Sequence, residues 1–224
     1  MKIWRVFSVL LEFNLKTIYF NFKYLPFRQA IYMPVFISRH VYLSNMEGSV
    51  SLLGQIAPRQ IRIGYKEVGI FDHKRSRSIW DVRGNVTFLG RATIGHGSKV
   101  SVNRNAVLVF GKKFSMSAES SIACSNKVEF GEDCLIAWET LIMDTDFHKI
   151  FDENRQQINE SKPIIIGDRT WIGCRCLILK GAKIPSGSII AANTTVNSKL
   201  LDGENKIFGG SPVHEIRSNV TWEK

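Results

Sequence analysis

The chain has 224 residues, of which 44% are hydrophobic and 22% are charged, a balance that excludes wholesale disorder and allows a substantial buried core. The 30 Lys and Arg residues outnumber the 20 Asp and Glu residues. The net charge of +10 favours an anionic partner, such as nucleic acid, an acidic membrane surface, a phosphorylated cofactor or an acidic polymer. No apolar run approaches the ~20 residues that span a bilayer.

The first 45 residues are predicted to form an N-terminal segment of helix followed by irregular chain. Apolar residues recur at helical spacing in its first dozen positions, so one side of the helix is apolar. One interpretation is a helix that only caps the rest of the fold. The alternative adds a peripheral contact with the inner face of a membrane, because aromatic residues alternate with Lys16, Lys23 and Arg28.

Two further features bear on the location of the protein. Glu12 interrupts the opening apolar stretch, and no small-residue cleavage site of an export signal follows it. The four cysteines show no disulfide-like spacing: Cys124, Cys134, Cys174 and Cys176. Both features predict a cytoplasmic protein.

A six-residue period dominates the second half of the chain. Aliphatic residues recur at every sixth position, at Ile166, Ile172, Ile178, Ile184, Ile190 and Val196. Four places after each of the first five stands a small or modest residue, namely Thr170, Cys176, Ala182, Ser188 and Thr194. This period predicts a parallel β-helix, an all-β fold in which three hexads close a triangular coil of eighteen residues.

The same phase continues upstream with irregular steps. Phe110, Met116 and Ile122 are predicted to stack on Phe130, Ile136 and Ile142, a shift of twenty residues that widens the corner at 124–127. We therefore predict a β-helix domain over 46–217 and a C-terminal tail over 218–224, with small residues such as Cys134 and Cys176 in the core.

The period breaks once, between Ile142 and Ile166. The intervening segment 144–163, "DTDFHKIFDENRQQINESKP", is polar and is predicted to protrude from the prism as a loop. Long insertions in a solenoid are more often functional than idle. The alternative is a solvated loop whose charges only keep the protein soluble.

The hexapeptide run, the "DTDFH" loop, the "IGDRTWIG" re-entry and the terminal "GGSPVHEIR" together resemble the left-handed β-helix acyltransferases. The resemblance covers about residues 80 to 217. Its nearest branch is the group of maltose and galactoside acetyltransferases and the O-acetyltransferases of capsule and lipopolysaccharide synthesis. It implies a homotrimer of left-handed prisms that binds acetyl-CoA between neighbouring prisms, as co-substrate, with no metal.

The resemblance also implies roles for residues near the loop. His148 falls on the catalytic histidine, a general base that takes the proton from a sugar hydroxyl as its oxygen attacks the thioester. Asp144 and Asp146 would orient the imidazole or bind acceptor hydroxyls. The acceptor-binding asparagine of the family corresponds here to Glu139. Trp138 is a second acceptor candidate, as a platform for a sugar ring, or else a buried structural residue.

For the cofactor, the resemblance points to Cys174 and Ala192, whose small side chains would let pantetheine approach the backbone. Arg217 would meet a phosphate of CoA. Trp171 either flanks the pantetheine or is an outward aromatic residue at the trimer seam.

The sequence thus predicts an acetyl-CoA-dependent O-acetyltransferase acting on a sugar hydroxyl of a surface polysaccharide or its precursor. The alternatives are acetylation of a small molecule, such as an antibiotic or a free sugar, and a non-catalytic β-helix scaffold. A nucleic-acid partner is not expected, because the basic residues are spread out and no binding motif appears.

Overall fold

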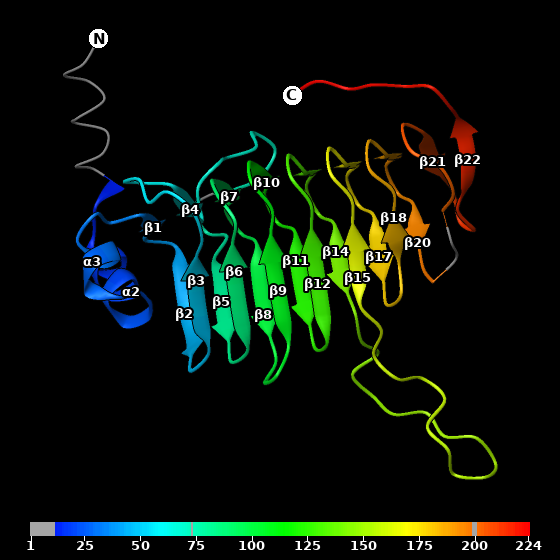
Figure 1. Ribbon diagram of the computed structural model, residues 1–224, viewed down its shortest axis with the longest axis horizontal. Coiled ribbons are helices and arrows are strands. Elements are labelled where there is room, and N and C mark those ends of the chain that lie inside the picture. The colour runs from blue at the N-terminus through cyan, green and yellow to red at the C-terminus, as the bar shows by residue number, and fades with distance from the viewer. Residues whose placement is uncertain (1–11, 73, 199–200) are drawn as a thin grey trace.

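The computed structural model describes residues 12–72, 74–198 and 201–224. Short strands form three sheets that run along one elongated prism (Figure 1). Sheet A contains β1 (Val35–Ile37), β4 (Ile61–Ile63), β7 (Ala92–Ile94), β10 (Phe114–Met116), β13 (Leu135–Ile136), β16 (Trp171–Ile172), β19 (Ile189–Ile190), β21 (Ile207–Gly209) and β22 (His214–Arg217). Sheet B contains β2 (Val41–Met46), β5 (Ser78–Val82), β8 (Lys99–Val102), β11 (Ser121–Cys124), β14 (Leu141–Met143), β17 (Leu177–Leu179) and β20 (Thr195–Val196). Sheet C contains β3 (Ser49–Leu52), β6 (Asn85–Phe88), β9 (Val107–Phe110), β12 (Lys127–Phe130), β15 (Ile164–Ile166) and β18 (Lys183–Ile184).

The predicted stacking of the hexads is confirmed by the strand register. Ile166 pairs with Ile184 in sheet C, and Ile172 pairs with Ile190 in sheet A. All four side chains are buried inside the prism. Every sixth side chain must point inward for the coil to close. This requirement explains both the six-residue period of the sequence and the register in which successive coils pair.

The wider coils upstream are filled by aromatic rings. Phe110 stacks between Phe88 and Phe130, with ring centroids 4.8 and 5.6 Å apart and planes inclined by only 13° and 2°. Met116 pairs with Ile136, which confirms the predicted shift of twenty residues. Offset stacking of this kind adds to the burial of large apolar rings.

The corners of the prism repeat a left-handed backbone position. At the corner from sheet A to sheet B, Glu119, Glu139, Arg175 and Asn193 all have φ between 55 and 59°. The amide of each donates to a carbonyl of the preceding coil, for example Asn193 N to Cys174 O at 2.9 Å. This ladder of hydrogen bonds offsets the strain of a positive φ in residues with a side chain. The small residues next to the corners are buried, as predicted, at Thr170, Cys176, Ala182, Ser188 and Thr194.

Helices α2 (Leu15–Tyr24) and α3 (Phe27–Ala30) cover the N-terminal end of the prism (Figure 1). Two polar side chains of α2 occupy the open edge of β1. Val35 N donates to Asn21 Oδ1 at 3.1 Å, and Ile37 N donates to Thr17 Oγ1 at 3.0 Å. A bare edge strand would be a template for aggregation, so this segment does cap the fold.

The coils begin earlier than the sequence indicated. Because β1 pairs with β4, strand pairing starts at Val35, inside the segment assigned to residues 1–45. The first predicted helix, at positions 3–11, lies outside the described residues. Among the described residues, the helices are too short or too polar to cross a membrane.

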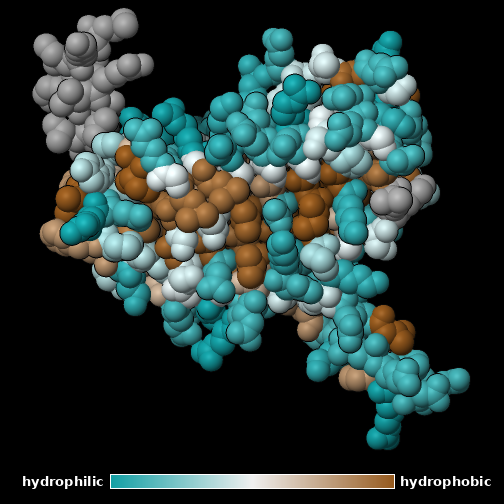
Figure 2. All heavy atoms as spheres, viewed as in Figure 1, coloured by the Kyte–Doolittle hydropathy of each residue, from teal (hydrophilic) through white to brown (hydrophobic). Residues whose placement is uncertain are grey.

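Two excursions leave the prism. The segment 144–163 joins β14 to β15 and protrudes as predicted, with a mainly hydrophilic surface (Figures 1 and 2). A second excursion, 64–77, joins β4 to β5 and was not predicted.

The chain reverses near its C-terminal end, where β22 pairs antiparallel with β21. The tail 218–224 then returns along sheet A. Its Trp222 ring lies 6.0 Å from the ring of Trp171, and Trp222 Nε1 donates to Arg169 O at 2.8 Å.

Candidate functional site

A cavity of about 400 Å³ runs along the corner between sheets A and B, and we call it the slot. It is formed where β10, β13, β16 and β19 end, so successive coils contribute equivalent positions. The lining residues are mainly apolar, and half of them are small: Lys66, Ser117, Leu135, Ala137, Trp138, Trp171, Gly173, Cys174, Ile189, Ile190, Ala191 and Ala192. Four residues predicted from sequence thus lie in one place, at Trp138, Trp171, Cys174 and Ala192.

The floor of the slot is formed by closely packed coils. A Cβ atom on Gly173 would lie 2.7 Å from Ala192 N and 2.8 Å from Ile190 O, so no larger residue fits there. In the next coil, Ala191 and Ala192 also have small side chains that leave the backbone accessible. The Trp171 side chain is 38% exposed and forms one side of the slot. Such a slot suits a thin, extended ligand whose amides can reach backbone groups, which fits pantetheine.

Two predicted ligand-binding residues lie outside the slot. Glu139 occupies a left-handed corner, and its carboxylate accepts a hydrogen bond from Arg175 Nε at 2.7 Å. This contact raises the pKa of Arg175. Arg217 is exposed on β22, two strands beyond β19 in sheet A.

His148 lies at the root of the 144–163 loop and is exposed. Its backbone is held on both sides: His148 N donates to Asp146 O at 2.7 Å, and Asn159 Nδ2 donates to His148 O at 2.7 Å. In the part of the chain that is described, the imidazole has no hydrogen-bonding partner. It is therefore presented to solvent from a fixed backbone.

Asp146 holds the loop rather than the imidazole. Its carboxylate pairs with the Lys180 ammonium and accepts from Asn159 Nδ2 at 2.9 Å. These two hydrogen bonds keep the pKa of Asp146 below its usual value. Lys180 Nζ also donates to Asn159 O at 3.1 Å, so Asp146, Asn159 and Lys180 form one cluster, the loop clamp.

Sequence reasoning missed Lys180 and Asn159. The strand register contains a signal for Lys180, because β17 pairs with β14 and the residue after β17 must lie beside the start of the loop. Asn159 has no such signal, since its place depends on how the loop folds back.

Asp144 does not take the predicted catalytic or acceptor-binding position. Its side chain is completely buried, and its two oxygens accept from Ser125 N at 2.6 Å and Asn126 N at 2.8 Å. These amides belong to the widened corner between β11 and β12. Asp144 therefore ties that corner to the next coil, a structural role.

The loop and the slot lie at different corners of the prism. The loop leaves the end of β14 toward sheet C, whereas the slot follows the ends of sheet A strands. None of the residues lining the slot belongs to 144–163. A single chain thus holds the histidine and the slot apart.

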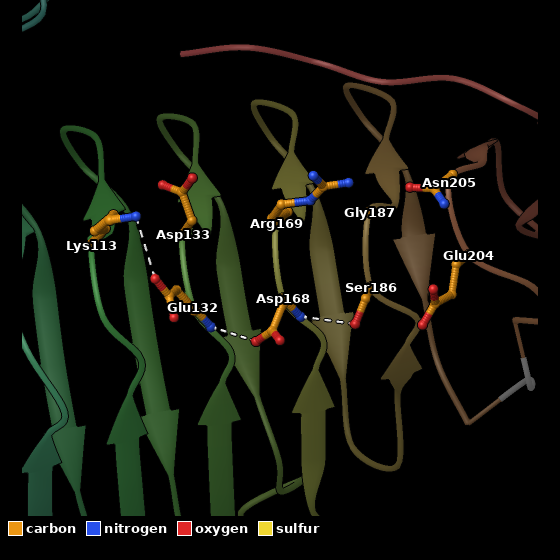
Figure 3. A pocket seen from close by; sticks show the side chains of 9 residues that line it. All are labelled: Lys113, Glu132, Asp133, Asp168, Arg169, Ser186, Gly187, Glu204 and Asn205. Atoms are coloured by element: carbon orange, nitrogen blue, oxygen red, sulfur yellow. Dashed lines mark hydrogen bonds and ion pairs between the residues drawn. The ribbon is translucent and has the colours of Figure 1, made fainter.

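A second, polar cavity of about 470 Å³ lies at the corner between sheets C and A (Figure 3). There, Glu132 N donates to Asp168 Oδ1 at 2.6 Å and Asp168 N donates to Ser186 Oγ at 3.1 Å. These bonds join successive coils, and the cavity contains none of the predicted site residues. Among the described residues, no three His, Cys, Asp or Glu side chains gather as a metal site.

Comparison with known proteins relates the chain to O-acetyltransferases, although no family model matches it. It is 35% identical over 100 residues to the polysialic acid O-acetyltransferase of Neisseria meningitidis, which covers 43% of this chain and 46% of that protein. It is 26% identical over 155 residues to the putative lipopolysaccharide biosynthesis O-acetyl transferase WbbJ of Escherichia coli K12. That match covers 63% of this chain and 78% of WbbJ. The chain spans about half the length of the first of these relatives.

The fold has a solved counterpart in the polySia-specific acetyltransferase NeuO. The two structures superpose with a TM-score of 0.62 at 21% identity, over 85% of this chain and 84% of that one. The fold is therefore the left-handed β-helix, as predicted. The predicted resemblance to hexapeptide-repeat acyltransferases is confirmed by the sequence and structural relatives.

Proposed function

We propose that this protein is an acetyl-CoA-dependent O-acetyltransferase whose acceptor is a sugar hydroxyl of a surface polysaccharide or its precursor. The observation that carries the proposal is the slot, which brings Trp171, Cys174 and Ala192 together in one mainly apolar cavity of about 400 Å³. The similarity to two O-acetyltransferases supports the same reaction. Acetylation of a small molecule has no specific observation in its favour.

The proposed chemistry needs one base and a bound thioester. His148 takes the hydroxyl proton while the acceptor oxygen attacks the thioester carbon, and the thiolate of CoA leaves as the acetyl ester forms. The exposed imidazole on a fixed backbone suits this task. The thioester is already activated, so direct transfer in a ternary complex requires no covalent enzyme intermediate.

We propose a homotrimer because one chain does not bring the base to the slot. In a trimer of parallel prisms, the loop of one copy can reach the slot of its neighbour. The exposed Trp171 and the protruding loop support this arrangement, since both offer surface that a second copy would cover. Dissociated protein should then bind acetyl-CoA weakly and transfer no acetyl group, which sedimentation and assay at low concentration would test.

The His148→Ala variant tests the proposed function. Loss of a general base should lower the turnover number by ~10² to 10⁴, with folding unchanged because the side chain is exposed. Release of free CoA thiol, measured with a panel of glycans and small acceptors, gives the rate. Near-normal turnover in the variant would remove His148 from the mechanism. If acetyl-CoA fails to raise the melting temperature, the scaffold alternative is favoured.

We also propose that the N-terminal cap touches an anionic membrane. The outer face of α2 and the adjoining α3 segment expose large apolar side chains, namely Leu15, Tyr19, Phe22, Phe27, Ile31 and Tyr32. The cations Lys23 and Arg28 lie among them, the combination expected at a lipid interface. Substitution of Leu15 and Phe27 by Ser should reduce sedimentation with anionic vesicles, and unchanged binding would refute the contact.

A further inference from the structure

The tail 218–224 runs back over the coils, in the direction opposite to their stacking (Figures 1 and 3). Burial alternates along it: Val220 and Trp222 are half-buried against the prism, whereas Thr221 and Glu223 are exposed. This period of two is typical of an extended segment that lies with one face on a surface. The tail therefore lies on the coils in a defined orientation.

The tail is fastened to a repeated backbone group at the corner between sheets C and A. In each coil there, a residue shortly before the sheet A strand has a left-handed backbone, and the tail bonds to the carbonyl oxygen of such residues in every second coil. The bonds run from Val220 N to Asn205 O at 3.0 Å, from Trp222 Nε1 to Arg169 O at 2.8 Å and from Lys224 Nζ to Lys113 O at 3.0 Å. Because the acceptors are equivalent positions of the coil repeat, the path of the tail is set by the prism itself.

Trp222 makes two contacts that converge on Trp171, which forms one side of the slot. The two indole rings have centroids 6.0 Å apart and planes inclined by 46°. Tilted aromatic pairs at this separation attract each other. The hydrogen bond from Trp222 Nε1 ends on Arg169, only two residues before Trp171. One residue of the tail thus holds both the ring of Trp171 and the backbone that leads to it.

The orientation of Trp171 matters because its neighbours in the slot are smaller. Trp171 points outward from the two-residue strand β16 and pairs in register with Leu135 of β13 and Ile189 of β19. All three line the slot, where Gly173 and Ala192 contribute little or no side chain. An exposed tryptophan has several staggered rotamers, and each places the indole in a different volume. The rotamer of Trp171 therefore decides how much of the slot is open.

We propose that Trp222 is a positioning residue for the acetyl donor: packed against Trp171, it selects the rotamer in which the slot accepts acetyl-CoA. The inference rests on the proposed function, because it takes the slot as the donor site. Trp222 is not among the residues that line the slot, so it acts through Trp171 rather than by touching the ligand. A ligand that binds one of two conformations binds more weakly when that conformation is less populated. Without Trp222, acetyl-CoA would have to order the Trp171 side chain itself.

The Trp222→Ala variant separates this role from a purely structural one through the affinity for acetyl-CoA, measured by calorimetry, and the steady-state kinetics. If Trp171 then adopts the binding rotamer about a tenth of the time, the Kd and the KM for acetyl-CoA should rise about tenfold. The turnover number at saturating acetyl-CoA should fall by less than about twofold, because the bound donor restores the rotamer. Trp222→Phe keeps an aromatic ring against Trp171, so it should raise the Kd by less than about threefold.

Fluorine NMR of protein labelled with fluorotryptophan reports on the Trp171 ring without any ligand. The Trp171 signal is assigned by its absence in Trp171→Phe. We expect this signal to shift and broaden in Trp222→Ala, because the ring then exchanges between rotamers. The matched control is Thr221→Ala, which alters the exposed neighbour of Trp222 in the tail. It should leave both the signal and the Kd for acetyl-CoA unchanged.

The inference is overturned if Trp222→Ala binds acetyl-CoA as tightly as the control, or if the Trp171 signal is the same in both variants. A lower melting temperature of Trp222→Ala with an unchanged Kd would also overturn it, because the tail would then only stabilise the fold. If the unsubstituted protein does not bind acetyl-CoA, the proposed function fails together with the inference. If it binds acetyl-CoA and transfers the acetyl group while Trp222→Ala binds equally well, only the inference fails.

Discussion

Replacement of Asp144 by Ala should unfold the corner that its carboxylate holds, while leaving the chemistry intact. The carboxylate is buried and accepts two backbone hydrogen bonds, at 2.6 and 2.8 Å. Hydrogen bonds to a charged group contribute about 1.5 to 3 kcal/mol each. Asn126 is exposed, so water can replace one partner, and the expected loss is about 3 kcal/mol. For a chain of this size, that loss lowers the melting temperature by about 6 to 12 °C.

Urea denaturation of the variant, followed by turnover per folded molecule at a temperature well below the transition, gives both quantities. Asp152→Ala is the matched control, because Asp152 also accepts two backbone hydrogen bonds but only within the protruding loop. It should change the free energy of unfolding by less than about 1 kcal/mol. Unchanged stability of Asp144→Ala together with a large loss of turnover would refute the structural role and return Asp144 to the catalytic site.

Four further outcomes are expected. Lys180→Met should let the pKa of Asp146 return toward its usual value. By loosening the loop clamp, it should also lower the turnover number about tenfold. An unchanged turnover number would show that the clamp does not position His148. Because the folded-state pKa of Asp146 is lowered, the clamp should stabilise the loop above about pH 4 and lose that contribution on further acidification, as NMR of the loop can test. Ala192→Trp should fill the slot and raise the KM for acetyl-CoA more than tenfold without changing the melting temperature, and an unchanged KM would place the donor elsewhere. Phe110→Ala should cost about 3 to 5 kcal/mol in urea denaturation, and a loss below 1 kcal/mol would contradict the stacked core.

The fold was readable from the sequence where packing alone decides it. In the C-terminal coils each inward side chain must fall six residues after the last, so Ile172 and Ile190 could be paired from their spacing. Upstream, Val86 pairs with Leu108 and Ile63 with Ile94, separations that no single period explains. The excursion 64–77 interrupts the count there, and strand pairing begins at Val35, eleven residues before the predicted start of the domain at residue 46.

The predicted site residues also differ in how well their positions followed from the sequence. Cys174 and Ala192 were assigned by resemblance, and the structure places both in the slot because they occupy equivalent corner positions of successive coils. Asp144 could not, because its role depends on two amides in a widened corner of the previous coil. Arg217 and Glu139 were assigned by resemblance alone, and neither lines the slot.

The coils of this prism are not interchangeable modules. Along sheet C the repeat shortens from 22 residues, between Val86 and Leu108, to 18, between Ile166 and Ile184. The strands shorten with it, from four residues in β6 to two in β18. Along this sheet the inward side chains change from phenylalanine, at Phe88, Phe110 and Phe130, to isoleucine, at Ile166 and Ile184. A coil moved from one end to the other would leave a void or a clash, so insertions and duplications that preserve the hexapeptide pattern should still fail unless the diameter also matches.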